Sequence, residues 1–495
     1  MRQSWRVYLA VIGAALCWLG VAFVALPRLG DAISFNQVSS AAAPAAAEAG
    51  DQVPSQDFRG NVYHIVFDGY QSEAYQYFLE KTPELSQLPF TYYPNFHSNS
   101  SLTYYSMPEL FTGNYFTPGA LPEDWHNTAF QGQGMLGYMA NVGIHLHSYV
   151  YHAEYCYRGA ATATCRATQE LKRGELSGGR AYQTAIDLWF LKLIPSSLKR
   201  ELNARFARED TGTDSGTSDD DSFSNWDYGF SIMNAVRPSG EPRDGDNPYF
   251  SMQEFMRFLD DEDARPATGQ YIFLHVILPH GPSVLDGECN YIGELTKAQG
   301  AAQAEQERYL EQVQCSHKLL GLLVKKLESL GRLDNSLIIA QADHGYYMYP
   351  ADLGVLYKFK PLAVAVPRID HDKADSSTWP SEMIEVKSSA LLLIKFPGQS
   401  SASRSDKPVQ MIDIAPTILR YFDIETPASM RGIPIQDMPA SPARDRFFFA
   451  SNRIPERTRP KVISEYRYAD GEWKFAEDIA IPTSADQLFI LRAAQ

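Results

Sequence analysis

The chain has 495 residues, 44% of them hydrophobic, and a formal net charge of −15 at pH 7. This apolar content is enough for one large core and a smaller subdomain. The acidic balance argues against nucleic acid as a partner, because phosphate backbones are bound by basic surfaces.

The N-terminus predicts a membrane anchor. Residues 1–6 carry Arg2 and Arg6, and residues 7–27 contain no charged side chain. At about 1.5 Å per residue, a helix over this segment crosses a bilayer, whereas the apolar core of a cleaved signal peptide has only about 7–15 residues. We therefore prefer an uncleaved anchor to a removed signal peptide. The positive-inside rule keeps residues 1–6 as a cytoplasmic stub, which predicts a single-pass protein of the inner (cell) membrane with a periplasmic or extracellular domain.

Residues 28–57 are rich in Ala, Ser and Pro and predict a flexible linker. From residue 58 to 425, strand-like runs alternate with amphipathic helices, which predicts an α/β domain with a largely parallel central sheet flanked by helices. The expected strands cover 61–67, 144–151, 271–278, 336–342, 362–366 and 390–396, and the expected helices cover 72–80, 103–112, 131–141, 303–330 and 414–422. Asp413 is expected to cap the last of these helices. Residues 426–495 are less periodic and predict a small α+β extension.

Residues 152–250 are the least regular part of this domain and predict an insertion. Within it, residues 209–221 hold clustered Asp among Ser, Thr and Gly, which predicts a solvated loop. Residues 182–208 combine aromatic and aliphatic side chains with Lys and Arg. Such a basic amphipathic segment either lies on anionic lipid or packs on the domain with its charges in solvent.

Cysteine usage agrees with an oxidising compartment. Cys17 lies in the expected anchor, which leaves Cys156, Cys165, Cys289 and Cys315 outside it. An even number of cysteines in such a compartment predicts two disulfides, with three possible pairings. We prefer Cys156–Cys165 and Cys289–Cys315 because both close short loops, and neither pair has the spacing of a zinc site.

Three of the expected strands end in residues that bind metals or transfer protons. Asp68 follows the first, His280 follows the third, and Asp343 and His344 follow the fourth, while Thr103 begins a helix. In an open α/β sheet, ligands gather beyond the carboxyl ends of the strands. We therefore expect these five side chains to meet and to hold one divalent metal ion beside an activated hydroxyl nucleophile.

Each of these motifs alone also fits a structural role. Asp-Gly and Asp-His-Gly are common turns, and a plain N-cap is the structural alternative for Thr103. Several other polar residues carry open alternatives. They are Ser100, Ser101 and Ser106 as competing nucleophiles, His275 as a structural residue, His145 and His147 as a metal pair or as packed histidines, and Lys358 and Lys360 as phosphoryl-binding or solvated lysines.

In their order and spacing, residues 60–425 resemble the alkaline phosphatase/sulfatase superfamily. The segment from Thr103 to Tyr115 is similar to the nucleophile segment of sulfatases, and 273–282 is similar to the His-Gly-Pro stretch of phosphoethanolamine transferases. Residues 411–419 look like the closing helix of that superfamily. The resemblance implies an alkaline phosphatase-like catalytic domain over 58–425. It also implies specific roles: metal ligation by Asp68, Thr103, Asp343 and His344, a covalent intermediate on Thr103, and assistance from His280.

Two departures from sulfatases favour phosphoryl over sulfuryl chemistry. Sulfatases usually carry two adjacent Asp residues at the first strand, whereas Gly69 follows Asp68 here, and Met107 stands where their Arg is expected. A Thr in place of Cys or Ser also does not form formylglycine. The Asp-x-x-x-His pair that supplies a second zinc in two-metal phosphatases and phosphodiesterases is also not evident. The resemblance therefore implies one divalent ion (Zn, Mn, Mg or Ca).

The resulting expectation is a membrane-anchored metalloenzyme. It would hydrolyse or transfer a phosphate ester group, of phosphoethanolamine or phosphoglycerol type, on an envelope lipid or glycan through a covalent Thr103 intermediate. A sulfate-ester hydrolase and a non-catalytic glycan- or lipid-binding relative are the alternatives.

Overall fold

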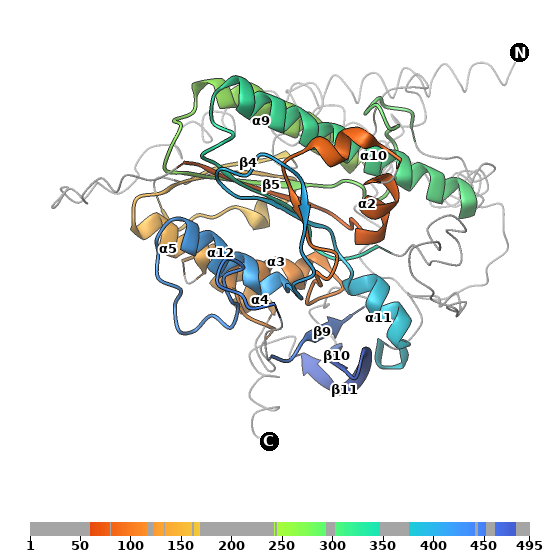
Figure 1. Ribbon diagram of the computed structural model, residues 1–495. Coiled ribbons are helices and arrows are strands. Elements are labelled where there is room, and N and C mark those ends of the chain that lie inside the picture. The colour runs from red at the N-terminus through yellow and green to blue at the C-terminus, as the bar shows by residue number, and fades with distance from the viewer. Residues whose placement is uncertain are drawn as a thin grey trace, which may run out of the picture. The chain divides into compact units, whose positions relative to one another are not determined.

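The computed structural model describes residues 60–79, 81–116, 122–132, 134–160, 163–168, 242, 245–293, 302–346, 376–440, 444–451 and 461–481 (Figure 1). The expected stub, anchor and linker, most of the 152–250 insertion, and the 362–366 strand with Lys358 and Lys360 lie outside these residues. Within the described part of the chain, no helix combines the length and the apolar character that a membrane crossing requires.

An eight-stranded sheet forms the centre of the fold and confirms the α/β class. The strands are β1 (Val62–Phe67), β2 (Thr91–Tyr92), β3 (His145–Val150), β4 (Ala163–Ala167), β5 (Gln270–Val276), β6 (Leu337–Ala342), β7 (Leu392–Lys395) and β8 (Ser403–Arg404). Their order is β4-β3-β5-β1-β6-β7-β2-β8. The strands from β4 to β6 are parallel, and β7 is antiparallel to both of its neighbours, so the sheet is mixed but mostly parallel.

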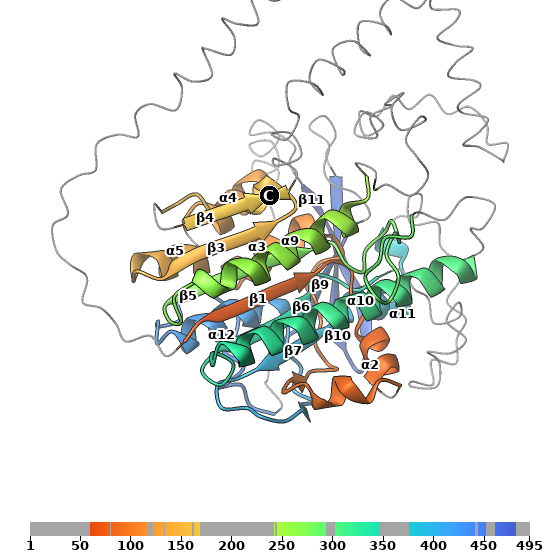
Figure 2. The same ribbon diagram turned by 90° about the horizontal axis from the view of Figure 1, so that it is seen from above.

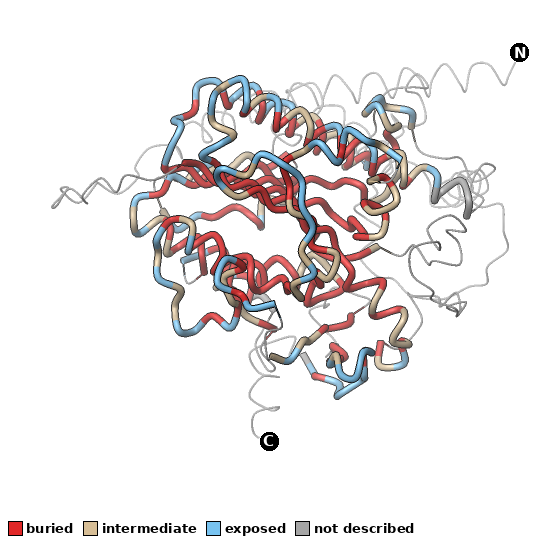
Figure 3. Tube along the Cα trace, viewed as in Figure 1, coloured by how far each residue is buried: buried red, intermediate tan, exposed pale blue. Residues whose placement is uncertain are grey.

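Helices cover both faces of this sheet (Figures 1 and 2). One layer contains α2 (Ser72–Leu79), α9 (Asn247–Asp261) and α10 (Ala302–Ser329), and the other contains α3 (Thr103–Thr112), α4 (Pro122–Phe130), α5 (Met135–Asn141) and α12 (Ile414–Tyr421). Because β1, β5 and β6 are covered on both sides, every one of their residues is buried (Figure 3). This burial explains why these strands are continuous apolar runs rather than alternating patterns.

A small antiparallel sheet forms the described part of the C-terminal extension. It consists of β9 (Phe447–Ala450), β10 (Lys461–Ala469) and β11 (Glu472–Ile481), in the order β11-β10-β9. The helix that packs against it, α11 (Ser381–Ser388), precedes residue 426. The expected α+β extension is therefore a three-stranded sheet, within the residues described, whose covering helix belongs to the preceding domain.

Two local expectations need correction. The helix expected over 131–141 begins only at Met135, and a separate helix, α4, precedes it. Asp413 does not cap α12 with its side chain. It ends a short 3-10 helix, where its carboxylate accepts hydrogen bonds from Gln410 N (2.7 Å) and Ile433 N (2.8 Å) and pairs with Arg444. A buried carboxylate needs such partners, and a distant Arg is not visible in a local capping pattern.

Both preferred disulfides are present. Cys156–Cys165 ties the segment after β3 to β4, and Cys289–Cys315 ties the loop after β5 to α10. The second bridge restrains the segment that follows His280. Disulfides of this kind are typical of proteins that fold in an oxidising compartment.

Candidate metal-dependent active site

Asp68, Asp343 and His344 meet beyond the carboxyl ends of β1 and β6. The register aligns Phe67 with Ala342, the last residues of the two strands, so the residues that follow them lie side by side. The three side chains are buried, and their possible ligand atoms all lie within 4.8 Å of one another. No other group of this kind occurs among the described residues.

Thr103 joins this cluster from the first position of α3. Its Oγ1 lies 3.4 Å from His344 Nε2. The residue in the N-cap position is Leu102, in extended conformation, so the plain N-cap alternative for Thr103 is wrong. The hydroxyl therefore lies at the helix N-terminus, where backbone N–H groups and the helix dipole favour a bound anion.

The three competing serines have other partners. Their hydroxyls donate hydrogen bonds from Ser100 to Glu109 Oε2 (2.8 Å), from Ser101 to Ser451 O (2.6 Å) and from Ser106 to Thr103 O (3.3 Å). None of these bonds points to the metal-binding cluster. Thr103 is the hydroxyl that the fold brings to it.

The hydrogen bonds of His344 define which ring nitrogen faces the cluster. Nδ1 lies 2.8 Å from the carbonyl oxygen of Gly345, to which it donates. Nε2 then carries the lone pair, 3.4 Å from Asp343 Oδ2 and 3.7 Å from Asp68 Oδ1. This is the arrangement of a metal-binding imidazole whose tautomer is set by a backbone carbonyl.

The two carboxylates carry buried oxygen atoms without partners. Asp343 Oδ1 accepts hydrogen bonds from Gly69 N (3.0 Å) and His344 N (2.9 Å), whereas Asp343 Oδ2 and Asp68 Oδ1 have no hydrogen-bond donor. Leaving charged oxygens unpaired in the protein interior is costly. Two orphaned oxygens beside an imidazole lone pair and a hydroxyl fit a single divalent cation, which all four would ligate.

Without a cation, the charge of the pair is poorly compensated. Burial, followed by the negative charge of Asp343, raises the pKa of Asp68 above its usual value. Burial also acts to raise the pKa of Asp343, but the charges of His344 and His275 and the hydrogen bond from Gly69 N outweigh it, so this pKa is lowered. A bound cation removes the conflict because it stabilises both ionised carboxylates.

His280 lies next to this cluster on the loop after β5. Its backbone N donates to Asp68 O (3.1 Å), and its Nδ1 donates to Gly281 O (2.8 Å), which leaves the Nε2 lone pair available. Gly69, with φ +65°, lies beside both imidazoles. A Cβ at this position would make ordinary contacts with His280 Cδ2 (3.5 Å) and His344 Cε1 (3.7 Å) but would crowd Tyr346 Cδ2 (3.0 Å).

His275 also lies at the site, although its position inside a strand favoured a structural role. Its Nε2 is 3.9 Å from Asp68 Oδ2, and neither ring nitrogen has a hydrogen-bond partner. Burial lowers the pKa of His275 to about 4, so the ring is neutral at neutral pH. The sheet register, which pairs His275 with Val66 two residues before Asp68, explains its location. No local sequence signal shows that register.

His145 and His147 do not form a metal pair. Both ring nitrogens of His147 have partners, Thr164 Oγ1 (2.7 Å) and Gln270 Oε1 (2.8 Å). The two histidines lie on β3 near its start, at the opposite end of the sheet from the cluster.

Gln312 on α10 holds the loop that carries His280. This fully buried side chain donates to Pro279 O (3.0 Å) and His280 O (3.1 Å) and accepts from Val284 N (3.0 Å) and Leu285 N (3.3 Å). One side chain thus satisfies four backbone groups of the loop.

Replacing Gln312 with Leu is expected to lower turnover roughly ten- to hundred-fold through misplacement of His280. The four backbone groups lose their partners, at about 1–3 kcal/mol for each group that stays unsatisfied. Metal content should stay at the wild-type level, because Gln312 contacts none of the four expected ligands. Ser316→Ala, one turn further along the same helix, is the matched control. Equal turnover in Gln312→Leu and wild type would contradict this role.

The extension sheet orders the segment that leads to Thr103. Phe449 N donates to Asn99 O (2.7 Å), and Ser101 N donates to Phe449 O (3.3 Å). Ser451 N donates to Ser101 Oγ (2.8 Å), which itself donates to Ser451 O. The start of α3 is therefore held from the C-terminal part of the chain.

Glu109, on the same helix as Thr103, predicts a pH-dependent stability. Burial raises its pKa to about 8, against the lowering effect of hydrogen bonds from Ser100 and Phe116 N. The pKa of Glu109 is higher in the folded state than in the unfolded state. The protonated side chain therefore stabilises the fold at pH values below the unfolded-state pKa, and this contribution is lost as the pH rises through about 8.

Replacing Glu109 with Gln keeps the shape of the side chain but removes its ionisation. At pH 8 the variant should be more stable than wild type by on the order of 2–4 kcal/mol, and at pH 5 nearly equal. Urea unfolding at both pH values tests this, and a pH-independent difference would contradict it.

Comparison with known proteins identifies the family of this fold and site. Residues 60–424 match the sulfatase family. The chain therefore belongs to the sulfatase family, within the alkaline phosphatase superfamily, as the motif order indicated. The ulvan-active sulfatase of Formosa agariphila is 23% identical over 206 residues, which cover 39% of this chain and 36% of that relative. The match thus spans little more than a third of the relative's length.

Solved structures with a similar fold include enzymes of several kinds. A phosphonate monoester hydrolase from Silicibacter pomeroyi is 14% identical, with a TM-score of 0.48 over 84% of this chain and 88% of that one. A lipoteichoic acid synthase from Listeria monocytogenes is 13% identical, with a TM-score of 0.44 over 88% and 89% of the two chains.

Proposed function

We propose that this protein is a metal-dependent enzyme that hydrolyses or transfers a phosphate ester group through a covalent intermediate on Thr103. The observation that carries the proposal is the meeting of Thr103 Oγ1 with the lone pair of His344 Nε2 and two orphaned carboxylate oxygens. A hydroxyl at a helix N-terminus, within reach of three metal-binding groups, is suited to nucleophilic catalysis. Asp68, Thr103, Asp343 and His344 would hold the cation.

The bound cation would lower the pKa of the Thr103 hydroxyl and stabilise negative charge on the phosphoryl oxygens. Deprotonated Thr103 Oγ1 attacks phosphorus, and a new O–P bond forms as the bond to the leaving alcohol breaks. His280, in its protonated form, donates its Nε2 proton to that alcohol and becomes neutral. In the second half, neutral His280 takes a proton from water or an acceptor hydroxyl, whose oxygen attacks phosphorus and releases Thr103.

His275 has a different role in this proposal. Buried and neutral beside Asp68, it orients that carboxylate rather than exchanging protons with solvent. His275→Gln is expected to weaken metal binding about ten- to hundred-fold, the usual effect of losing a group that orients a ligand. Metal content against free metal concentration measures this loss. If His275→Gln binds the metal ion as tightly as wild type, His275 has only the structural role that the sequence favoured.

The substrate class proposed is an envelope lipid or glycan that carries a phosphodiester, of the phosphoethanolamine or phosphoglycerol type. Support comes from the expected N-terminal anchor, which lies outside the described residues, and from two disulfides typical of an oxidising compartment. Together they would place the site outside the inner membrane, next to such substrates.

Sulfate-ester hydrolysis is the second candidate, favoured by the ulvan-active sulfatase among the relatives. Thr103 argues against it. The aldehyde hydrate of formylglycine can release sulfate by elimination, whereas a Thr sulfate ester cannot.

The test uses the full-length chain loaded with Zn²⁺ or Mn²⁺ and two chromogenic probes, bis-p-nitrophenyl phosphate and p-nitrophenyl sulfate. Metal-dependent turnover of the phosphodiester alone supports the proposal. Turnover of the sulfate alone would favour the second candidate, and a chain that neither retains metal nor turns over either probe would be a binding relative.

A further inference from the structure

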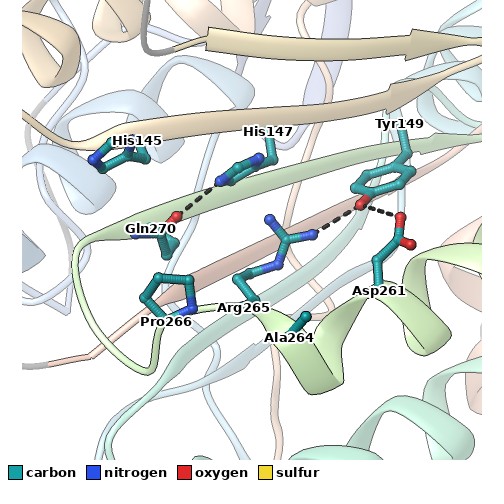
Figure 4. A pocket seen from close by; sticks show the side chains of 8 residues that line it. All are labelled: His145, His147, Tyr149, Asp261, Ala264, Arg265, Pro266 and Gln270. Atoms are coloured by element: carbon teal, nitrogen blue, oxygen red, sulfur yellow. Dashed lines mark hydrogen bonds between the residues drawn. The ribbon is translucent and has the colours of Figure 1, made fainter.

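A cavity of about 390 Å³ lies away from the metal-binding cluster, beside the starts of β3 and β5 (Figure 4). Both strands begin there, at His145 and Gln270, and run toward the metal-binding end of the sheet. We call it the Arg265 cavity. Its lining residues are His145, His147, Tyr149, Asp261, Ala264, Arg265, Pro266 and Gln270.

A buried guanidinium faces this cavity with one unused donor group. Arg265 is 8% exposed, and its Nε and Nη2 donate to Glu262 Oε2 (2.7 Å) and to Tyr149 OH (2.8 Å). No acceptor for Nη1 occurs among the described residues, and Figure 4 shows this group directed into the cavity toward His147. Two hydrogen bonds therefore hold the guanidinium in place while its third nitrogen stays available.

Arg265 shares its partner carboxylate with a second guanidinium group. The carboxylate of Glu262 is shared, because Arg332 Nη1 also donates to it (2.7 Å). Two guanidinium groups thus face one carboxylate. The pKa of His147, which also lines the cavity, is lowered first by burial and next by the charge of Arg265.

Other groups at the rim suit hydroxyls and a sugar ring. Asp261 Oδ2 accepts from Tyr149 OH (2.9 Å) and from Arg166 Nη1 (3.5 Å). The Asp261 side chain stays 43% exposed and its Oδ1 can accept a further donor. Pro266 and Ala264 add small apolar surface, and His145 is exposed. A cavity of this size, with few polar groups at defined positions, fits one small ligand.

We propose that the Arg265 cavity binds an acidic saccharide unit. Its carboxylate, sulfate or phosphate group would accept from Arg265 Nη1, and its hydroxyls would donate to Asp261. The site would hold an anionic glycan at a distance from the metal-binding cluster. It does not depend on the reaction proposed above, because no residue is shared between the two sites.

Binding to the full-length chain tests the proposal, measured by saturation-transfer NMR and calorimetry. The probes are galacturonate, glucose 6-sulfate and glucose 6-phosphate, with glucose and inorganic sulfate as comparisons. The acidic sugars should bind and glucose should not. Added NaCl should weaken the binding of the acidic sugars, because their contact with Arg265 is between charged groups.

Ala264→Trp should weaken binding of the acidic sugars by at least about tenfold, because the indole fills the space of the ligand. Met256→Trp, a bulky change at an exposed α9 position that does not line the cavity, is the matched control.

Asp343→Asn separates this site from the metal-binding cluster. Its binding of the acidic sugars should equal that of wild type, whether or not the enzyme is active. The proposal is overturned if no acidic sugar binds, if Ala264→Trp binds as well as Met256→Trp, or if binding disappears in Asp343→Asn. Binding of inorganic sulfate as tight as that of glucose 6-sulfate would also overturn it, because the saccharide would then contribute nothing.

Discussion

Thr103→Ala is expected to lower phosphodiester turnover by at least about 10³-fold, because it removes the attacking oxygen of the proposed covalent step. Thr103→Ser keeps that oxygen and should retain measurable activity. Intact and peptide mass spectrometry of the metal-loaded full-length chain, after incubation with envelope phospholipids, provides a direct readout. An adduct on the Thr103 peptide, absent in Thr103→Ala, would have a mass that identifies the transferred group.

Ser106→Ala is the matched control for this experiment. Its hydroxyl lies on the same helix and donates to Thr103 O, but it does not point to the metal-binding cluster. Its turnover and its adduct should match those of wild type. An adduct on a different residue, or full turnover in Thr103→Ala, would show that Thr103 is not the nucleophile.

Loss of the metal is expected to have the second large effect, on stability as well as on activity. A cation bound at 100 times its Kd stabilises the fold by about 2.7 kcal/mol, which a chelator removes. Asp343→Asn keeps an acceptor for Gly69 N and His344 N but removes one buried charge. The variant should lose its metal and its turnover. EDTA should then leave the stability of this variant unchanged, because it holds no cation to remove.

Metal content by mass spectrometry and thermal unfolding with and without EDTA measure both parts of this prediction. EDTA should lower the unfolding temperature of metal-loaded wild type and leave that of Asp343→Asn unchanged. If EDTA leaves the unfolding temperature of wild type unchanged, and metal-loaded samples retain no ion, the orphaned oxygens of Asp68 and Asp343 have another explanation and the enzyme proposal fails.

The residues that sequence reasoning found share one property. Asp68, Asp343 and His344 directly follow buried strands, and Thr103 directly begins a helix, so their positions relative to the sheet edge follow from local patterns. The residues that sequence reasoning missed contact parts of the site that are distant from them in sequence. His275 reaches the site through the register of β5 with β1, and Gln312 reaches the loop of His280 from a helix. Neither relation leaves a local signal.

The same distinction applies to the fold. Hydrophobic period and element order predicted an α/β sheet, the long α10 helix and both disulfide pairings, because these depend on nearby residues or on short loops. The antiparallel direction of β7, the separate α4 helix and the pairing of Asp413 with Arg444 depend on which distant segments pack together.

By itself, the sequence determined the class of fold, the family and the chemical type of the metal-binding cluster, because strand ends and residue types carry that information. The tertiary structure decided which hydroxyl and which imidazole nitrogen face the carboxylates, and that their oxygens have no other partner. It also decided that Arg265 presents a free donor to a cavity at the opposite end of the sheet from that cluster. Such features arise from distances between residues that are remote in sequence, which only the packed sheet and helices define.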